Sequence, residues 1–62
     1  MILTVFSHIG DTLSITEAYS RLISIYKGLG KPYPENRAAA SLGGSVSNGV
    51  IVLNNGFYTR IK

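Results

Sequence analysis

VIVLNNGFYTRIK, residues 50–62, predicts a β-hairpin at the C-terminus. Asn55 and Gly56 at its centre are typical of a type I′ turn, because both central positions of that turn need a positive φ. Runs rich in β-branched and aromatic residues flank this pair on both sides. Two registers fit the sequence equally well, one with a two-residue loop and one with a three-residue loop that places Gly56 in a bulge.

In the two-residue register the hairpin has two faces that differ in charge. The face without charged residues carries Val50, Val52, Phe57, Thr59 and Ile61. The other face carries Ile51, Leu53, Tyr58, Arg60 and Lys62. In both registers Tyr58 and Arg60 lie together, an arrangement that suits contact with phosphates or an acidic surface. The same pattern is also typical of an ordinary solvated sheet face.

A chain of 62 residues predicts a single small domain, spanning residues 1–62, that buries only about 60% of its unfolded surface. It has no cysteine, one histidine and three acidic residues, so we expect no disulfide, no metal site and no cofactor. Hydrophobic residues make up 45% of the chain and charged residues 15%, which is low in charge for a soluble monomer. Self-association would supply the missing stability, and we therefore expect a homodimer.

The beginning of the chain favours a cytoplasmic protein. Residues 1–17 contain no cation, and the apolar run of residues 1–6 ends at Ser7 and His8, so a secretory signal is not expected. No apolar stretch approaches the roughly 20 residues that cross a bilayer, so we expect no membrane association. Met1 leads directly into a sequence typical of folded structure, which suggests a complete small open reading frame.

The net charge of +3 is unevenly distributed. Residues 1–35 contain three cations and three acids, whereas residues 36–62 contain three cations and no acid. Such asymmetry is one signature of a polyanion-binding face, although three cations are few beside the clusters usual in nucleic-acid binders.

The helices and strands follow from local patterns. Residues 1–6, MILTVF, predict a strand, and residues 7–14 predict a polar link. Ser14 followed by Glu17 predicts a capping box at the start of a helix that ends at Gly28 or Gly30. The apolar face of that helix consists of Ile15, Ala18, Tyr19, Leu22, Ile23, Tyr26 and Leu29.

The next segment, Lys31-Pro32-Tyr33-Pro34, predicts a stiff connector, because each proline favours an extended preceding residue. Pro34 suits the first position of a second helix, which we expect to end at Gly43 or Gly44. An extended Tyr33 would keep its ring near the surface. Exposed tyrosines near cations recur at recognition sites, but packing against the first helix is the favoured interpretation.

The resulting order β-α-α-β-β predicts an α+β domain with a three-stranded antiparallel sheet, in which residues 1–6 pair beside the hairpin and helices cover one face. This order resembles that of the Cro-type phage repressors, which are small and dimerise through their strands. The resemblance implies a dimeric DNA-binding regulator. Residues 28–34 are longer than the turn of a helix-turn-helix, and no recognition helix is evident after Gly43.

No catalytic arrangement is evident, so we expect that the protein is not an enzyme. Ser7 and His8 would point to opposite faces of a strand, and no oxyanion site accompanies them or Asp11. The glycine-rich residues 43–49 lack the lysine and Ser/Thr of a phosphate-binding loop.

Two functional hypotheses follow. The first is a dimeric nucleic-acid-binding regulator, and the second is a phage-encoded inhibitor that blocks a host protein through its sheet edge or its Pro-Tyr-Pro connector. A structural subunit of a larger particle is a third alternative. The candidate binding residues for nucleic acid or a protein partner are Lys31, Tyr33, Arg37, Tyr58, Arg60 and Lys62.

Overall fold

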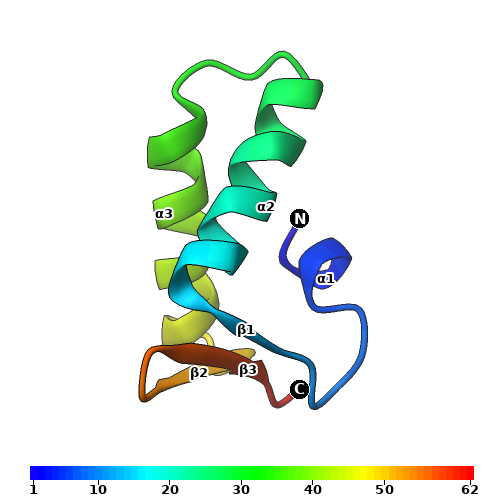
Figure 1. The fold of residues 1–62 in the computed structure, drawn as a ribbon, viewed down its shortest axis with the longest axis vertical. Helices are drawn as coiled ribbons and strands as arrows, with labels where there is room; N and C mark the ends of the chain where they lie inside the picture. The colour runs from blue at the N-terminus through cyan, green and yellow to red at the C-terminus, as the bar shows by residue number, and fades with distance from the viewer.

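The computed structural model describes all 62 residues as two layers, with a helical hairpin standing on one face of a three-stranded sheet (Figure 1). The elements, in chain order, are α1 (Ile2–Val5), β1 (Thr12–Ser14), α2 (Ile15–Gly28), α3 (Pro34–Ser47), β2 (Ile51–Asn54) and β3 (Phe57–Arg60). The strands are antiparallel in the order β1-β3-β2. The predicted α+β class, the helix-covered antiparallel sheet and the C-terminal hairpin are confirmed.

The strand predicted for the first residues of the chain is wrong. Residues 2–5 form the short helix α1, and the third strand is Thr12–Ser14, within the segment expected to be a polar link. The reason is the spacing of the apolar side chains. Ile2, Val5 and Phe6 are all buried, and a strand would have turned Val5 and Phe6 to opposite faces. One helical turn lets all three pack against the core.

The hairpin has the two-residue loop, and the bulged register is not adopted. Asn54 pairs with Phe57, while Asn55 and Gly56 between them have φ values of 52° and 80°. Positive φ at both central positions is the type I′ geometry that the Asn-Gly pair favours. Val52 is therefore paired with Thr59 across the two strands.

Helix α2 follows its sequence signals closely. The Ser14 hydroxyl accepts a hydrogen bond from the Glu17 backbone N–H at 3.1 Å, as expected of an N-cap. The Glu17 carboxylate does not complete a capping box, because it pairs with the Arg21 guanidinium at 2.9 Å. The helix ends at Gly28, as predicted. Its apolar stripe packs inward in the middle, whereas Ile15 and Leu29 at its two ends are exposed.

Helix α3 begins at Pro34 as predicted, but it does not end at Gly43 or Gly44. The helix continues for another turn to Ser47. Leu42 is buried, and an end at Gly43 would have interrupted the chain where α3 packs over the sheet. A glycine in a helix interior costs only about 1 kcal/mol, so tertiary packing outweighs it here.

The stop signal of α3 is instead Gly49, whose φ is 73°. Two hydrogen bonds close the helix end as a Schellman motif, from the Gly49 N–H to the Val46 carbonyl and from the Val50 N–H to the Ser45 carbonyl, both at 3.0 Å. This turn feeds the chain directly into β2. The sharp exit brings Ile51 under the helices, where it is fully buried.

The core lies between the helices and the sheet and is entirely apolar. It consists of Ile2, Val5, Phe6, Ala18, Leu22, Ala38, Leu42 and Ile51. Tyr19 and Tyr26 pack against it from α2, as the apolar stripe predicted. The Tyr19 hydroxyl also donates a hydrogen bond to the Glu35 carbonyl at 3.0 Å, which ties α2 to the first turn of α3.

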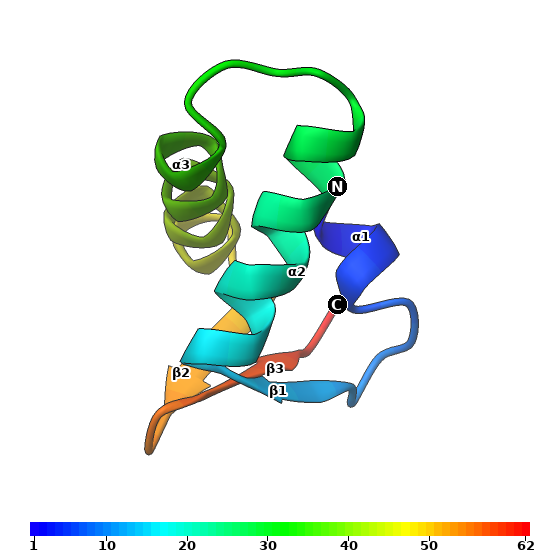
Figure 2. The same ribbon diagram turned by 45° about the horizontal axis from the view of Figure 1, so that its top comes forward.

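Arg60 joins the end of the chain to its beginning. Its Nη1 donates to the Phe6 carbonyl at 3.0 Å and its Nε to the Lys62 carbonyl at 2.9 Å. Phe6 is the C-cap of α1, so this half-buried guanidinium holds α1 and the C-terminal residues together (Figure 2). Hydrogen bonds from a charged donor contribute more than neutral ones.

Replacing Gly43 and Gly44 by alanine is expected to stabilise the protein. A Cβ at either position would meet no atom within 4 Å, and each alanine should recover about 0.5–1 kcal/mol of helix propensity. Urea denaturation measures the gain. Gly49→Ala is the matched control and should destabilise, because alanine does not tolerate its φ of 73°. A less stable G43A/G44A double variant would contradict this account of α3.

Arg60→Ala should lower the free energy of unfolding by about 1–3 kcal/mol, because two carbonyls lose their charged donor. Arg21→Ala, which removes an exposed ion pair within one helix, should cost only about 0.3–0.5 kcal/mol. Chemical denaturation of both variants gives the comparison. An equal loss of unfolding free energy in the two variants would show that the Arg60 hydrogen bonds do not stabilise the fold.

Candidate interaction site at the helix connector

The six predicted site residues fall into two groups at opposite ends of the molecule. Lys31, Tyr33 and Arg37 belong to the connector between α2 and α3 and to the first turn of α3, at the top of Figure 1. Tyr58, Arg60 and Lys62 belong to β3 and the C-terminus, at the bottom. The long axis of the molecule measures 29 Å, so the two groups do not form one surface.

The hairpin group lies on the side of the sheet that the helices cover. Ile51, Tyr58 and Arg60 share one face by register and alternation, and Ile51 is fully buried. Tyr58 is half-buried, packs against the core and pairs with Leu13 of β1. The face of Tyr58 and Arg60 is therefore not a solvated sheet face, and the Arg60 guanidinium is bonded within the chain.

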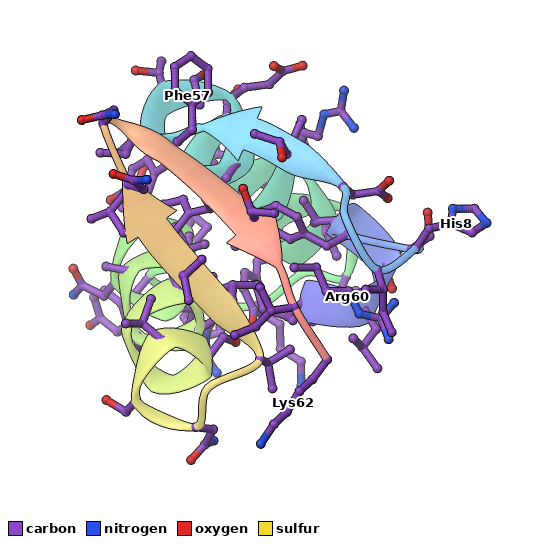
Figure 3. The ribbon with its side chains drawn as sticks, turned by 90° about the horizontal axis from the view of Figure 1, so that it is seen from below. His8, Phe57, Arg60 and Lys62 are labelled. Carbon is purple, nitrogen blue, oxygen red and sulfur yellow. The ribbon has the colours of Figure 1, made fainter.

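Lys62 remains exposed near the end of α3. Its Nζ lies 3.8 Å from the position that a Cβ on Gly49 would occupy. The last turn of α3 contains no basic residue of its own. A cation at that position is favourable beside the partial negative charge of a helix C-terminus. Figure 3 shows Lys62 and Arg60 at the same corner of the sheet.

The connector adopts a conformation that the sequence did not predict. Tyr33, expected to be extended, is left-handed with φ 54° and ψ 55°. Two hydrogen bonds from Arg37 hold this turn, one from its Nε to the Pro32 carbonyl at 2.7 Å and one from its N–H to the Tyr33 carbonyl at 3.0 Å. They fold the connector back onto the first turn of α3, against the local preference of a residue that precedes proline.

Tyrosine at position 33 does not favour the stability of the fold. A left-handed conformation costs a non-glycine residue about 1–2 kcal/mol, and a tyrosine at an N-cap provides no side-chain hydrogen bond there. The residue is 73% exposed, so the ring does not pack against α2, contrary to the favoured interpretation. The Tyr33 side chain makes no cap hydrogen bond and does not pack against the core.

The surroundings of Tyr33 are positively charged. Lys31 and Arg37 are exposed on either side of it, and Lys27 is exposed in the last turn of α2. Glu35 is the only acidic residue between Lys27 and Ser47. The Arg37 guanidinium makes its hydrogen bond through Nε, which fixes its orientation while its Nη groups face other directions. We call Lys31, Tyr33 and Arg37 the connector site.

Other polar groups are placed as follows. The His8 side chain is exposed and points away from the molecule (Figure 3), and its Nδ1 lies 3.9 Å from Asp11 Oδ2. Asp11 Oδ2 also accepts a hydrogen bond from the His8 backbone N–H at 3.0 Å.

The structure contains no pocket and no group of three or more potential metal-ligating side chains. None of its helices is both long enough and apolar enough to span a bilayer.

A second surface was not identified as exposed by the sequence analysis. The side of the sheet away from the helices carries uncharged residues only, and we call it the outer sheet face (Figure 3). Its residues are Thr12, Ser14, Val52, Asn54, Phe57, Thr59 and Ile61. The alternation of the hairpin placed four of these residues together, but β1 was not predicted. The opposite face, with Tyr58 and Arg60, was expected to be the contacting one, and that expectation is wrong.

Comparisons with known proteins do not assign this chain to a group. No protein-family model matches it, and no curated protein or solved structure matches it. The connector site and the outer sheet face are therefore interpreted from their own geometry and chemistry.

Proposed function

We propose that the protein is a non-enzymatic binding protein whose connector site recognises an acidic segment of another protein. The single observation that carries this proposal is Tyr33. It is a largely exposed aromatic residue in a strained, left-handed backbone conformation, and it is not part of the core. Strain of this kind persists at ligand clamps and binding loops because the surrounding structure enforces it.

The connector is well suited to present an anchor. Pro32 and Pro34 restrict the backbone on both sides of Tyr33, and the Arg37 hydrogen bonds close the turn. A preordered loop loses little conformational entropy on binding. Tyrosine is also among the residues that most often dominate binding energy when a partner buries them.

The charges indicate the chemistry of the partner. Lys31 and Arg37 flank Tyr33 and offer donors to carboxylates, and the orientation of Arg37 is already fixed. An acidic segment with an apolar residue for the Tyr33 ring would satisfy both features. Complementary charge of this kind also steers association and discriminates against basic partners.

A nucleic-acid-binding regulator is the competing proposal, and the net charge of +3 favours it. That proposal relies on all six cations of the chain, which the fold places far apart or bonds internally. Arg60 donates to two backbone carbonyls, Arg21 pairs with Glu17, and the remaining cations lie at both ends of a 29 Å molecule. Phosphate binding along a duplex usually involves a continuous basic face.

Tyr33→Gly should raise stability and abolish binding. Glycine tolerates the left-handed conformation, so we expect about 0.5–1 kcal/mol more unfolding free energy by urea denaturation after the entropic cost of glycine. Asn55→Gly is the matched control at a second positive φ, and should change stability less because asparagine suits its turn. Reduced stability of Tyr33→Gly would mean that the ring contributes to the fold.

A titration can distinguish the two partners. We expect that an oligoglutamate peptide with one central leucine shifts the backbone amide signals of residues 31–37 in a ¹⁵N-labelled sample at low salt. Lys31→Glu should remove these shifts, and Lys62→Glu, which makes the same charge change at the other end, should preserve them.

Short duplex DNA is titrated in parallel. Larger shifts with DNA than with the peptide, lost in Lys62→Glu, would favour the nucleic-acid proposal over ours. Shifts that Lys31→Glu leaves unchanged would exclude the connector site as the contact.

A further inference from the structure

We propose that the outer sheet face binds the same face of a second copy of this chain, so that two sheets pack face to face between outer layers of helices. The observation behind this proposal is the chemistry of that face. It exposes Phe57 by 50%, Ile61 by 47% and Val52 by 40%, with no charged residue among its strand positions. Sheets that pack on each other use uncharged inner faces of this kind.

The two threonine hydroxyls at the centre of the face are already satisfied within the chain, and the Ser14 hydroxyl has one partner as an acceptor. The hydroxyls of Thr12 and Thr59 are 2.9 Å apart and bond to each other across β1 and β3. The Ser14 hydroxyl accepts the Glu17 N–H at the start of α2. Burying a hydroxyl costs free energy chiefly when it loses its hydrogen bonds. The Thr12 and Thr59 hydroxyls can therefore be covered by an apolar surface at small cost.

The charge distribution allows a second copy as the occupant. Each copy has a net charge of +3, so two copies repel wherever their cations approach. Alternation places Arg60 on the helix side of the sheet, and the Lys62 Nζ lies near Gly49 at the end of α3. Two outer sheet faces can therefore meet without bringing like charges together, and a twofold axis would set identical apolar residues against each other.

The two edges of the sheet, β1 and β2, are weaker contacts, and β1 has only three residues. Val52 and Asn54 are in hydrogen-bonded pairs with β3, so the free backbone groups of β2 belong to Ile51 and Leu53. Ile51 is fully buried, which removes half of that edge from solvent. The remaining Leu53 offers too few hydrogen bonds to hold a second strand, so the face is the better surface.

The size of the face limits the affinity. It closes one end of the molecule, as the view along the long axis shows (Figure 3), and the two shorter extents are 19 and 18 Å. A standard interface buries about 800 Å² on each partner, more than a flat area of this size provides. We therefore expect a reversible dimer with a dissociation constant in the micromolar to millimolar range.

The arrangement places the two connectors at opposite ends of the dimer. Each protomer is 29 Å long, with its connector at the end remote from the sheet (Figure 1). A dimer would then present two connector sites that point away from each other and could bridge two partner segments. This consequence rests on the proposed function, whereas the dimer itself rests only on the sheet.

Sedimentation velocity and ¹⁵N-resolved spectra, recorded from micromolar to millimolar protein, test the proposal. We expect a monomer–dimer equilibrium in which the amide signals of β1, β2 and β3 shift with concentration and those of residues 29–37 do not. The unmodified protein suffices for this measurement. A monomer at all concentrations, or shifts centred on the helices, would overturn the proposal.

Variants make the test specific. Phe57→Lys places a cation on each contacting face, at the hairpin end of the sheet, and should weaken dimerisation at least tenfold. Leu29→Lys is the matched control, because Leu29 is 54% exposed at the opposite end and gains the same charge. Phe57→Thr, which keeps a residue suited to strands, replaces the lysine variant should the latter not fold. A dimer that the Phe57 variants leave intact would reject the outer sheet face.

Discussion

The burial of Ile51 beneath α2 and α3 determines the orientation of the sheet. Once this side chain is fully enclosed, strand alternation turns Leu13, Tyr58 and Arg60 toward the helices and Phe57 and Thr59 away from them. A slip of one residue in the pairing would exchange the two sets. The Asn55-Gly56 turn fixes the register, and the Schellman motif after α3 delivers Ile51 to its place. The chemistry of both ends of the molecule follows from this arrangement.

One consequence is that formal charge is a poor guide to function in this chain. The basic C-terminal half suggested a surface for polyanions, but the Arg60 guanidinium closes the fold by bonding the carbonyls of Phe6 and Lys62. In a domain with so small a core, a half-buried arginine that joins α1 to the end of β3 replaces some of the packing that a larger protein would have. The Arg60 cation therefore stabilises the fold. Fewer cations remain to bind a ligand than the number of lysines and arginines in the sequence suggests.

The two surfaces that remain have different chemistry and lie at opposite ends. The connector site combines a strained, exposed Tyr33 with Lys31 and Arg37, which suits an acidic partner. The outer sheet face is uncharged, and the hydroxyls of Thr12 and Thr59 bond to each other, which suits a dry contact. Neither surface is needed to complete the core, which consists of buried side chains between the layers. A small domain of this kind can therefore separate binding of a partner from self-association.

The sequence by itself determined the features that depend on local backbone preferences. These are the Ser14 cap and the extent of α2, the start of α3 at Pro34, and the position of the Asn55-Gly56 turn, although not the register of its hairpin. It also kept Lys31, Tyr33 and Arg37 together, because they are close in the chain. Only the tertiary structure decided that residues 2–5 are helical, where α3 ends, and which face of the hairpin is outward. Both faces of the hairpin carry apolar residues, so local patterning could not rank them, and long-range packing against the two helices made the choice.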